Sequence, residues 1–249
     1  MISIVIAAYN EEKRIRKSLV RVKEYLTGQD MDYEIIVVDD GSIDRTSKVL
    51  KDSTSDIPHL KIISYEMNKG KGYALRKGAL ASKGEIVLLT DADLSTPVEE
   101  LSRLLPLIHD NECDIVIGSR ALALSEIIKK QPWWRQSMGK IFNKVVKILV
   151  LDDFSDTQCG FKIFSGDIAR GMFREARIDR FAYDVEILAL AKKKGYRISE
   201  VPIKWINSPE SKVNPIRDSL QMLFDLLRIR STVGSMKNKR IHLSNPPGF

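Results

Sequence analysis

Residues 85–97 read EIVLLTDADLSTP, and the fold prediction starts from this stretch. Apolar residues fill positions 86–89, which is typical of a strand that is buried on both faces, as in a parallel sheet. The strand then runs into Asp91 and Asp93. In an extended chain, residues two apart point to the same side, so these carboxylates would repel each other unless a cation lay between them. The stretch predicts a core strand with a cation near its end.

The acidic pair has two interpretations. Asp91 and Asp93 are either solvated turn acids or oxygen ligands of a hard divalent cation, Mg²⁺ or Mn²⁺. The residues that follow have a simpler explanation. Thr96 suits a helix N-cap, Pro97 suits the first helical position and Glu99 completes a capping box. A helix start therefore accounts for these three residues and leaves the acids unexplained.

Strand and helix patterns alternate through the first half of the chain. Predicted strands cover residues 2–7, 34–38, 60–64, 86–90 and 114–118. Predicted helices cover about residues 11–26, 45–50, 72–82 and 97–109. This alternation predicts an α/β fold with a mostly parallel central sheet and flanking helices, joined by right-handed crossovers.

Polar residues follow every predicted strand of that sheet. The strand ends read, in order, AAYNEE, DDGS, NKGKG, DAD and GSR. Because ligands bind at the carboxyl ends of parallel strands, these segments predict one site that combines acids for a metal, Lys and Arg for phosphates, and an aromatic side chain for a base or sugar. The spacing of the glycines matches neither a P-loop nor a dinucleotide fingerprint.

Composition limits the class of protein. The chain has 249 residues, 43% hydrophobic content and a net charge of +7, which indicates anionic partners such as nucleic acid, phosphorylated ligands or an acidic membrane. No apolar run approaches the ~20 residues of a membrane-spanning helix, and the N-terminal stretch is not expected to be a signal peptide. Cys113 and Cys159 are expected to be reduced, packed thiols.

Six motifs together resemble glycosyltransferase family 2: VIAAYNEEKRI, IIVVDDGSIDRT, NKGKGYALRKG, LLTDADLSTP, VIGSR and DTQCGFKIF. Among its members, the chain is most similar to polyprenyl-phosphate glycosyltransferases, the dolichyl-phosphate glucose and mannose synthases. The match extends over residues 1–232 and leans toward the glucose synthases. The resemblance implies a single GT-A catalytic domain over residues 1–232. The residues that follow, 233–249, are expected from their own sequence to form a flexible tail.

The resemblance also implies roles for individual residues. Nucleotide-sugar binding is expected of Ala7, Tyr9, Glu11, Val38, Asp40, Lys71, Asp91 and Ala92. The metal is expected on Asp93, with help from Asp91 and from Ser95, which is the weakest ligand of the three because a hydroxyl stands where the mannose synthases commonly have Gln. The acceptor phosphate is expected to meet Arg120, Arg135 and Lys212. Asp93, Arg120 and Lys212 are the expected catalytic residues.

The expected reaction is inverting, metal-dependent transfer of a hexose to a polyprenyl or dolichyl phosphate. UDP-glucose is the first candidate donor, with GDP-mannose and UDP-N-acetylglucosamine next. A phosphate monoester is largely ionised near neutral pH, its second pKa being ~6, so it can attack the sugar with little help from a base. Asp156 is expected either to contact sugar hydroxyls or to cap a turn.

Three other functions are compatible with parts of the sequence. A family 2 enzyme that acts on a glycan hydroxyl would need a base, and Asp184 or Glu186 could supply it; both are otherwise early-turn acids that suit a helix dipole. A basic nucleic-acid-binding protein is a remote alternative, because no recognition helix or stacking motif is present. A non-catalytic membrane scaffold would not need the Asp91, Asp93 and Arg120 set.

Two amphipathic helices are predicted at about residues 133–151 and 215–232. The first lies in a segment without acids, carries Lys140, Lys144 and Lys147 on one face, and contains the adjacent Trp133 and Trp134. Basic, aromatic-bearing helices of this kind lie in membrane interfaces, although packing on the core or at a homo-oligomer interface is the alternative. We therefore expect a peripheral protein on the cytoplasmic face of a membrane, without a transmembrane helix.

Overall fold

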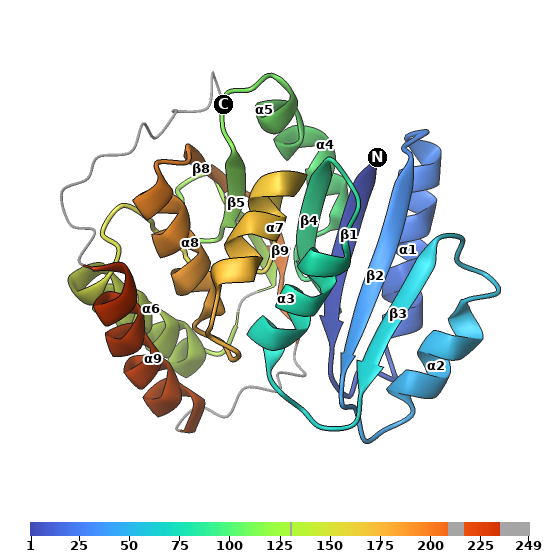
Figure 1. Ribbon diagram of the computed structural model, residues 1–249, viewed down its shortest axis with the longest axis horizontal. Helices are drawn as coiled ribbons and strands as arrows, with labels where there is room; N and C mark the ends of the chain where they lie inside the picture. The colour runs from blue at the N-terminus through green and yellow to red at the C-terminus, as the bar shows by residue number, and fades with distance from the viewer. Residues whose placement is uncertain (130, 209–216, 235–249) are drawn as a thin grey trace.

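The computed structural model describes residues 1–129, 131–208 and 217–234 (Figure 1). Within these residues, seven strands form one sheet in the order β3-β2-β1-β4-β7-β5-β8. Their bounds are β1 Ile2–Ala8, β2 Tyr33–Asp40, β3 Leu60–Tyr65, β4 Ile86–Asp91, β5 Ile115–Ser119, β7 Lys162–Ser165 and β8 Ile198–Pro202. All pairings are parallel except those of β7, which runs antiparallel to both β4 and β5. The predicted, mostly parallel sheet is confirmed.

The central strands are buried on both faces, as their unbroken apolar runs predicted. Val5 of β1 packs in the core on one side of the sheet, whereas Ile4 and Ile6 pack in the core on the other side. This alternation follows from the two-residue period of a strand. The sheet therefore separates two apolar cores, and polar groups are left for the strand ends.

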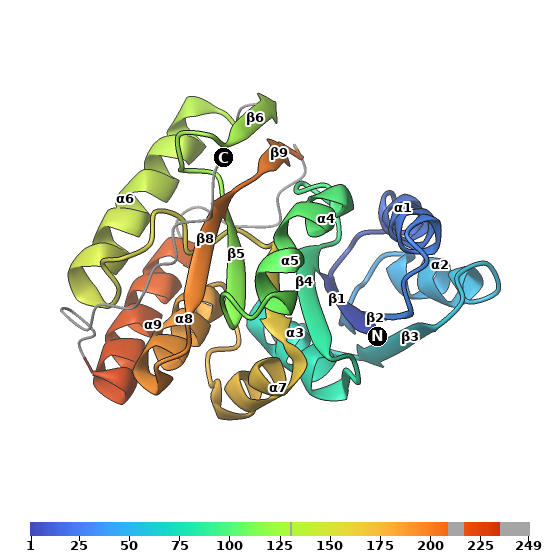
Figure 2. The ribbon, with the colours of Figure 1, turned by 90° about the horizontal axis from the view of Figure 1, so that it is seen from above.

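Helices cover both faces of the sheet (Figure 2). One face carries α1 Ile15–Gly28, α2 Thr46–Ser53, α4 Leu101–Leu104 and α5 Pro106–His109. The other face carries α3 Lys71–Ala81, α7 Gly166–Glu175 and α8 Tyr183–Lys194. The chain thus has the three-layer arrangement of a doubly wound sheet.

The segment predicted as one helix over residues 97–109 differs from that prediction. It consists of a 3₁₀ turn, η1 Val98–Glu100, followed by the short helices α4 and α5. Pro106 has no N–H to donate to the preceding turn, which accounts for the break before α5. The predicted capping box does not form, because the Glu99 carboxylate accepts hydrogen bonds from Arg21 at 2.9 and 3.0 Å.

The two predicted amphipathic helices are α6 Trp133–Leu149 and α9 Arg217–Val233, which contact each other beside α8 (Figures 1 and 2). In α6 only Val146 is buried. Large apolar side chains are exposed along both helices: Trp133, Trp134, Ile141, Ile148, Leu220, Leu223, Phe224 and Leu227. Among the described helices, none combines the length and apolar content that crossing a bilayer would require. The remaining strands, β6 Glu126–Lys129 and β9 Lys204–Ile206, form a small separate sheet.

Candidate active site

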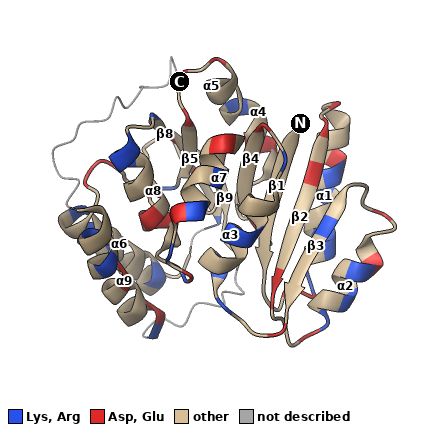
Figure 3. Ribbon diagram, in the orientation of Figure 1, with Lys and Arg blue, Asp and Glu red and all other residues tan. Residues whose placement is uncertain are grey.

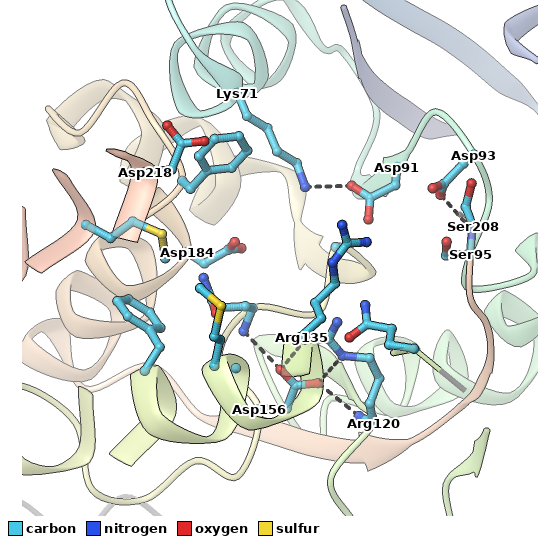
Figure 4. A pocket seen from close by; sticks show the side chains of 18 of the residues that line it. Lys71, Asp91, Asp93, Ser95, Arg120, Arg135, Asp156, Asp184, Ser208 and Asp218 are labelled. Atoms are coloured by element: carbon cyan, nitrogen blue, oxygen red, sulfur yellow. Dashed lines mark hydrogen bonds and ion pairs between the residues drawn. The ribbon is translucent and has the colours of Figure 1, made fainter. Parts of the chain in front are cut away.

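A pocket of ≈ 830 Å³ opens at the carboxyl ends of β1, β2, β4 and β5 and extends to α6 and α9 (Figure 4). Eleven predicted site residues line it: Ala7, Tyr9, Glu11, Asp40, Lys71, Asp91, Ala92, Asp93, Ser95, Arg120 and Arg135. Parallel strands bring their carboxyl ends to one edge of a sheet, which explains why ten of these residues, from five strand ends, meet here. Arg135 reaches the pocket from α6. Lys212 lies outside the described residues.

Val38 differs from the other predicted residues. Its side chain is fully buried in the core beneath α3, where it packs near Gly78. It therefore contributes to the core between the sheet and α3, and its side chain does not line the pocket. The prediction that Val38 contributes to nucleotide-sugar binding has no support from the position of this side chain.

The acidic end of β4 forms a tight turn. The backbone N–H of Leu94 donates to the Asp91 carbonyl at 3.1 Å, and Leu94 has a left-handed φ of 47°. The N–H of Ser95 donates to Asp93 Oδ1 at 2.9 Å. The prediction from spacing assumed an extended chain after Asp91. The structure has a turn there instead. Both carboxylates nevertheless line the same pocket.

Asp91 is paired with Lys71, the first residue of α3. Lys71 Nζ lies 2.6 Å from Asp91 Oδ1 (Figure 4). Burial by itself would raise the pKa of the Asp91 carboxyl, but the Lys71 ammonium lowers the pKa below its ordinary value. Burial would likewise lower the pKa of Lys71, but Asp91, with Asp184 and Asp93 nearby, raises it to about 12. Both groups are charged at neutral pH.

Gly160, in the DTQCG segment, makes room for the Asp91 carboxylate. A Cβ atom on Gly160 would lie within 2.6 Å of the carboxyl carbon and both oxygens of Asp91. Real Cβ contacts are not this short, so any other residue would displace Asp91. The glycine of this motif is therefore explained by close approach to an acidic side chain.

Arg120 follows β5 and is held by Asp156. Its Nε and Nη2 lie 2.7 and 2.8 Å from the two Asp156 oxygens, and its guanidinium stacks 5.6 Å from the Trp205 ring. Burial would raise the pKa of Asp156, but Arg120 lowers it below its ordinary value. Asp156 also accepts the N–H of Gln158 at 3.2 Å, so it caps a turn as one of the two expectations had it. Asp156 engages Nε and Nη2 of Arg120, so Nη1 is the guanidinium nitrogen that could bind a ligand.

Glu200 of β8 holds the loop that carries Asp156. Its carboxylate accepts the backbone N–H of Asp156 at 2.7 Å and that of Ser155 at 2.9 Å. From the other side, the Asn143 amide of α6 donates to the Ser155 carbonyl. The loop that fixes Arg120 is thus attached both to the sheet and to α6.

Asp40, which was predicted to bind the nucleotide-sugar, has partners within the protein. Its carboxylate accepts hydrogen bonds from Tyr65 Oη at 2.7 Å, Asn68 Nδ2 at 2.8 Å, and the N–H groups of Lys69 at 2.8 Å and Gly70 at 2.9 Å. Gly70 has a φ of 110° and lies against the Asp179 carbonyl, which accounts for a glycine here. Asp40 borders the pocket, and its observed interactions hold the loop over residues 68–70.

The two candidate bases on α8 differ in position. The Glu186 carboxylate accepts the backbone N–H groups of Arg177 and Ile178, so it ties the preceding loop to the helix. Asp184 lines the pocket and is paired with Lys162, whose ammonium also donates to the Cys159 carbonyl. Burial raises the pKa of the Asp184 carboxyl above its ordinary value.

Sequence reasoning missed several residues of the pocket. Lys162 is fully buried beneath it, and no local pattern distinguishes this lysine from a surface one. Arg14 lines the pocket, forms an ion pair with Glu11, and lies 3.8 Å from Asp93 Oδ2. The three-residue spacing of Glu11 and Arg14 was a usable signal for that pair. Arg180, in the loop before α8, also lines the pocket, and no pattern in the surrounding sequence predicted this position.

The far end of the pocket is lined by large apolar side chains and also by polar ones, among them Lys140, Asn143 and Asp218. Trp134, Met138 and Phe142 of α6 line it, together with Phe181 and Met222. Arg135 extends from α6 between the Lys71–Asp91 and Arg120–Asp156 pairs (Figure 4). In the described part of the chain, the Arg135 guanidinium forms no ion pair and lies 5.2 Å from the Trp134 ring. Lys and Arg recur along the same helix (Figure 3).

Sequence comparisons give consistent results. The family model described as Glycosyl transferase family 2 matches residues 3–171. A dolichyl-phosphate beta-glucosyltransferase of Dictyostelium discoideum is 35% identical over 92% of this chain and 73% of its own length. Proteins of the same description from Homo sapiens and Saccharomyces cerevisiae are 36% and 33% identical, each over 92% of this chain and 74% of their own length.

Solved structures resemble the chain as well. A Mycobacterium tuberculosis glucosyl-3-phosphoglycerate synthase, in complex with Mn²⁺, UDP-glucose and phosphoglyceric acid, superposes with a TM-score of 0.69. The similarity covers 94% of this chain and 80% of that one, at 19% identity. At this identity the similarity shows the fold, which is the GT-A architecture expected from the sequence.

Proposed function

This chain belongs to glycosyltransferase family 2, and we propose that it transfers glucose from UDP-glucose to dolichyl phosphate or a related polyprenyl phosphate. The relatives described as dolichyl-phosphate beta-glucosyltransferases support both the sugar and the acceptor. GDP-mannose and UDP-N-acetylglucosamine remain second-choice donors. Residues 1–232 would act as one catalytic domain.

The observation that carries the proposal is a single pocket with two chemically different ends. One end, at the strand termini, presents Lys71, Asp91 and Asp93. The other end, between α6 and α9, presents Trp134, Met138 and Phe142 and their apolar neighbours. A nucleotide diphosphate suits the first end and an isoprenoid chain suits the second. Arg135 lies between the Lys71–Asp91 and Arg120–Asp156 pairs, and it would meet the acceptor phosphate there (Figure 4).

The residues at the polar end fit a divalent metal ion. Asp91 and Asp93 offer carboxylate oxygens in the same pocket, and Ser95 lies beside them (Figure 4). Hard oxygen donors of this kind suit Mg²⁺ or Mn²⁺, which typically keep positions open for substrate phosphates. When bound, such an ion would offset charge on the diphosphate leaving group.

The chain's own residues would bind and orient the two phosphates. Arg135 and Nη1 of Arg120 would hold the acceptor phosphate, and Lys71 would approach the diphosphate. Arginine can bind a phosphate through two parallel N–H groups, which fixes the direction of attack. The acceptor oxygen is already ionised near neutral pH, so no base is needed. In-line attack on an α-linked donor would give the β product.

The exposed faces of α6 and α9 would place the enzyme on a membrane. Trp133 of α6 is 79% exposed and Phe224 of α9 is 67% exposed, while Lys140, Lys144 and Lys147 supply positive charge. Aromatic and basic side chains together favour the interface of an anionic bilayer. We therefore propose peripheral binding at the cytoplasmic face, with the apolar end of the pocket next to the lipid.

A hydroxyl acceptor is the alternative, and the Asp184 carboxylate in the pocket favours it. A base there would take the proton that a hydroxyl must lose. Glu186 is less suited to this role, since its carboxylate is engaged by backbone N–H groups. The double variant Lys162→Met/Asp184→Asn removes the carboxylate without leaving a lone buried charge, so it would abolish transfer to a hydroxyl and would retain transfer to a phosphate.

The test is transfer of radiolabelled sugar to a short polyprenyl phosphate. UDP-glucose, UDP-N-acetylglucosamine and GDP-mannose would be supplied in parallel, with Mn²⁺ or EDTA, to the native enzyme and to Asp93→Ala. We expect metal-dependent transfer of glucose that Asp93→Ala loses. Metal-dependent hydrolysis of the donor without any lipid product would contradict the acceptor assignment and retain the enzyme class.

A further inference from the structure

We infer that Lys71 is an exchangeable counter-cation: its ammonium neutralises Asp91 before the donor binds, and moves to the donor's diphosphate when a divalent ion takes Asp91. The observation behind this is the 2.6 Å contact between Lys71 Nζ and Asp91 Oδ1, made inside the pocket by a carboxylate that fits a metal. The inference rests on the proposed metal-dependent function. It adds an order of events and a coupling between metal and nucleotide.

Lys71 is placed to move, unlike Arg120 and the buried Lys162. Arg120 is fixed by two hydrogen bonds to Asp156 and by the Trp205 ring. Lys162 is 1% exposed and is held by both Asp184 and the Cys159 carbonyl. The Lys71 side chain is 26% exposed and begins at the first residue of α3, so its flexible stem can swing into the pocket.

Charge balance explains why the exchange needs both ligands. A divalent ion that arrives alone must displace the ammonium from Asp91, and the released ammonium would remain near Asp93 and Asp184 without a direct partner. A diphosphate that arrives alone finds Lys71 already engaged. When both arrive together, the ion takes the carboxylate and the ammonium takes a phosphate oxygen. Metal and nucleotide must then strengthen each other's binding by the same factor.

The test is a thermodynamic cycle on the full chain, with no lipid present. Binding of Mn²⁺ alone is measured by the free-ion electron paramagnetic resonance signal, and binding of UDP by calorimetry with and without Mn²⁺. For Lys71→Met we expect Mn²⁺ alone to bind about 10-fold more tightly. Affinity for UDP alone should stay within about 2-fold of the native value, while affinity for UDP with Mn²⁺ should fall about 10-fold.

Lys69→Met is the matched control, because Lys69 is an exposed lysine two residues away whose ammonium faces Tyr73. It removes the same charge and should leave all three affinities near the native values. If Lys71→Met weakened UDP binding equally with and without Mn²⁺, Lys71 would be a permanent phosphate ligand and the inference would be wrong. Unchanged affinity for Mn²⁺ alone would also overturn it.

A second variant gives an effect of opposite sign. Asp91→Asn releases Lys71, so UDP without metal should bind several-fold more tightly, while the gain from Mn²⁺ is lost. Unchanged metal-free affinity for UDP in this variant would contradict the exchange. A native protein that binds neither Mn²⁺ nor UDP would overturn both this inference and the proposed function, whereas intact coupling without glucose transfer would overturn the proposed function alone.

Discussion

The strand end and the helix end of the pocket are built in opposite ways. At the strand end, Lys71, Arg120 and Lys162 each have a carboxylate partner, and Glu200 holds the loop that carries Asp156, the partner of Arg120. At the helix end, α6 buries a single residue, Val146, and its Arg135 forms no ion pair among the described residues. The strand end is therefore preorganised by internal charge pairs, whereas the helix end presents groups that suit a lipid phosphate and its chain.

The largest expected effect is a loss of unfolding free energy when the most buried charge pair of the strand end is broken. Lys162→Met leaves the Asp184 carboxylate without its cation in a buried site, and breaking such a pair costs about 3–5 kcal/mol of unfolding free energy. Urea denaturation would measure the loss. Lys144→Met on α6, a lysine outside the described ion pairs, should stay within about 0.5 kcal/mol of the native protein.

The double variant Lys162→Met/Asp184→Asn is the control for this explanation. Removing the uncompensated carboxylate should recover most of the lost stability, because the remaining side chains are neutral. If Lys162→Met cost less than about 1 kcal/mol, the pair would be a minor contributor and the contrast between the two ends would be weaker.

Two glycines, one at each end, give the next test. Gly160→Ala places a Cβ within 2.6 Å of the Asp91 carboxyl atoms, whereas no atom of the described residues lies within 4 Å of a Cβ at Gly139 on α6. Overpacking of this kind costs about 1–3 kcal/mol. If this cost destabilises the complex with UDP and Mn²⁺ but not the free protein, the affinity for UDP with Mn²⁺ should drop roughly 5- to 150-fold. Calorimetry would measure it.

Gly139→Ala should leave that affinity unchanged and stabilise α6 by up to about 1 kcal/mol, since alanine is the better helix former. Equal UDP affinities for the two alanine variants would show that Asp91 tolerates displacement, and the close packing at Gly160 would then have no functional consequence.

The strand end was largely predictable from the sequence, and the reasons are local. Unbroken apolar runs predicted the strands, because a strand that is buried on both faces is apolar along its whole length. The Asp, Gly and Asn residues that follow these runs predicted the polar strand ends. The same rule applied strictly would have placed Val38 in the core, since its strand is apolar until Asp39. The turn after Asp91 was not predictable, because a left-handed φ is rare for Leu.

The sequence did not predict which side chains of the site would form hydrogen bonds and ion pairs with one another. Glu200 reaches the N–H groups of Ser155 and Asp156, and Lys162 reaches Asp184, across separations that no local pattern encodes. These contacts depend on how β7 and β8 lie in the sheet. For the helix end, periodicity predicted α6 and α9 themselves, but not that both would line the pocket.

Glu200 connects the two ends, so its substitution gives an intermediate effect. Glu200→Gln removes the charge that attracts the N–H groups of Ser155 and Asp156, and hydrogen bonds to charged groups contribute about 1.5–3 kcal/mol. We expect kcat for glucose transfer to fall about 10-fold with little change in the KM for UDP-glucose, because Arg120 is misplaced toward the acceptor.

Glu175→Gln is the control, since Glu175 lies at the end of α7 and pairs with an exposed lysine. Its kinetic parameters should match those of the native enzyme. A Glu200→Gln variant that lost thermal stability but kept kcat would indicate that the loop is a structural element with no influence on Arg120.

The smallest expected effect is on the exposed face of the helix end. Trp133→Ala should change unfolding free energy by less than about 0.5 kcal/mol, because the side chain is 79% exposed. If this side chain enters a bilayer interface, partial burial would contribute about 1 kcal/mol, and binding to anionic vesicles should weaken about fivefold. Sedimentation with vesicles would measure it, with Ile43→Ala as control, since Ile43 is 85% exposed in the loop after β2. Equal vesicle binding by the two variants would mean that Trp133 does not contact lipid.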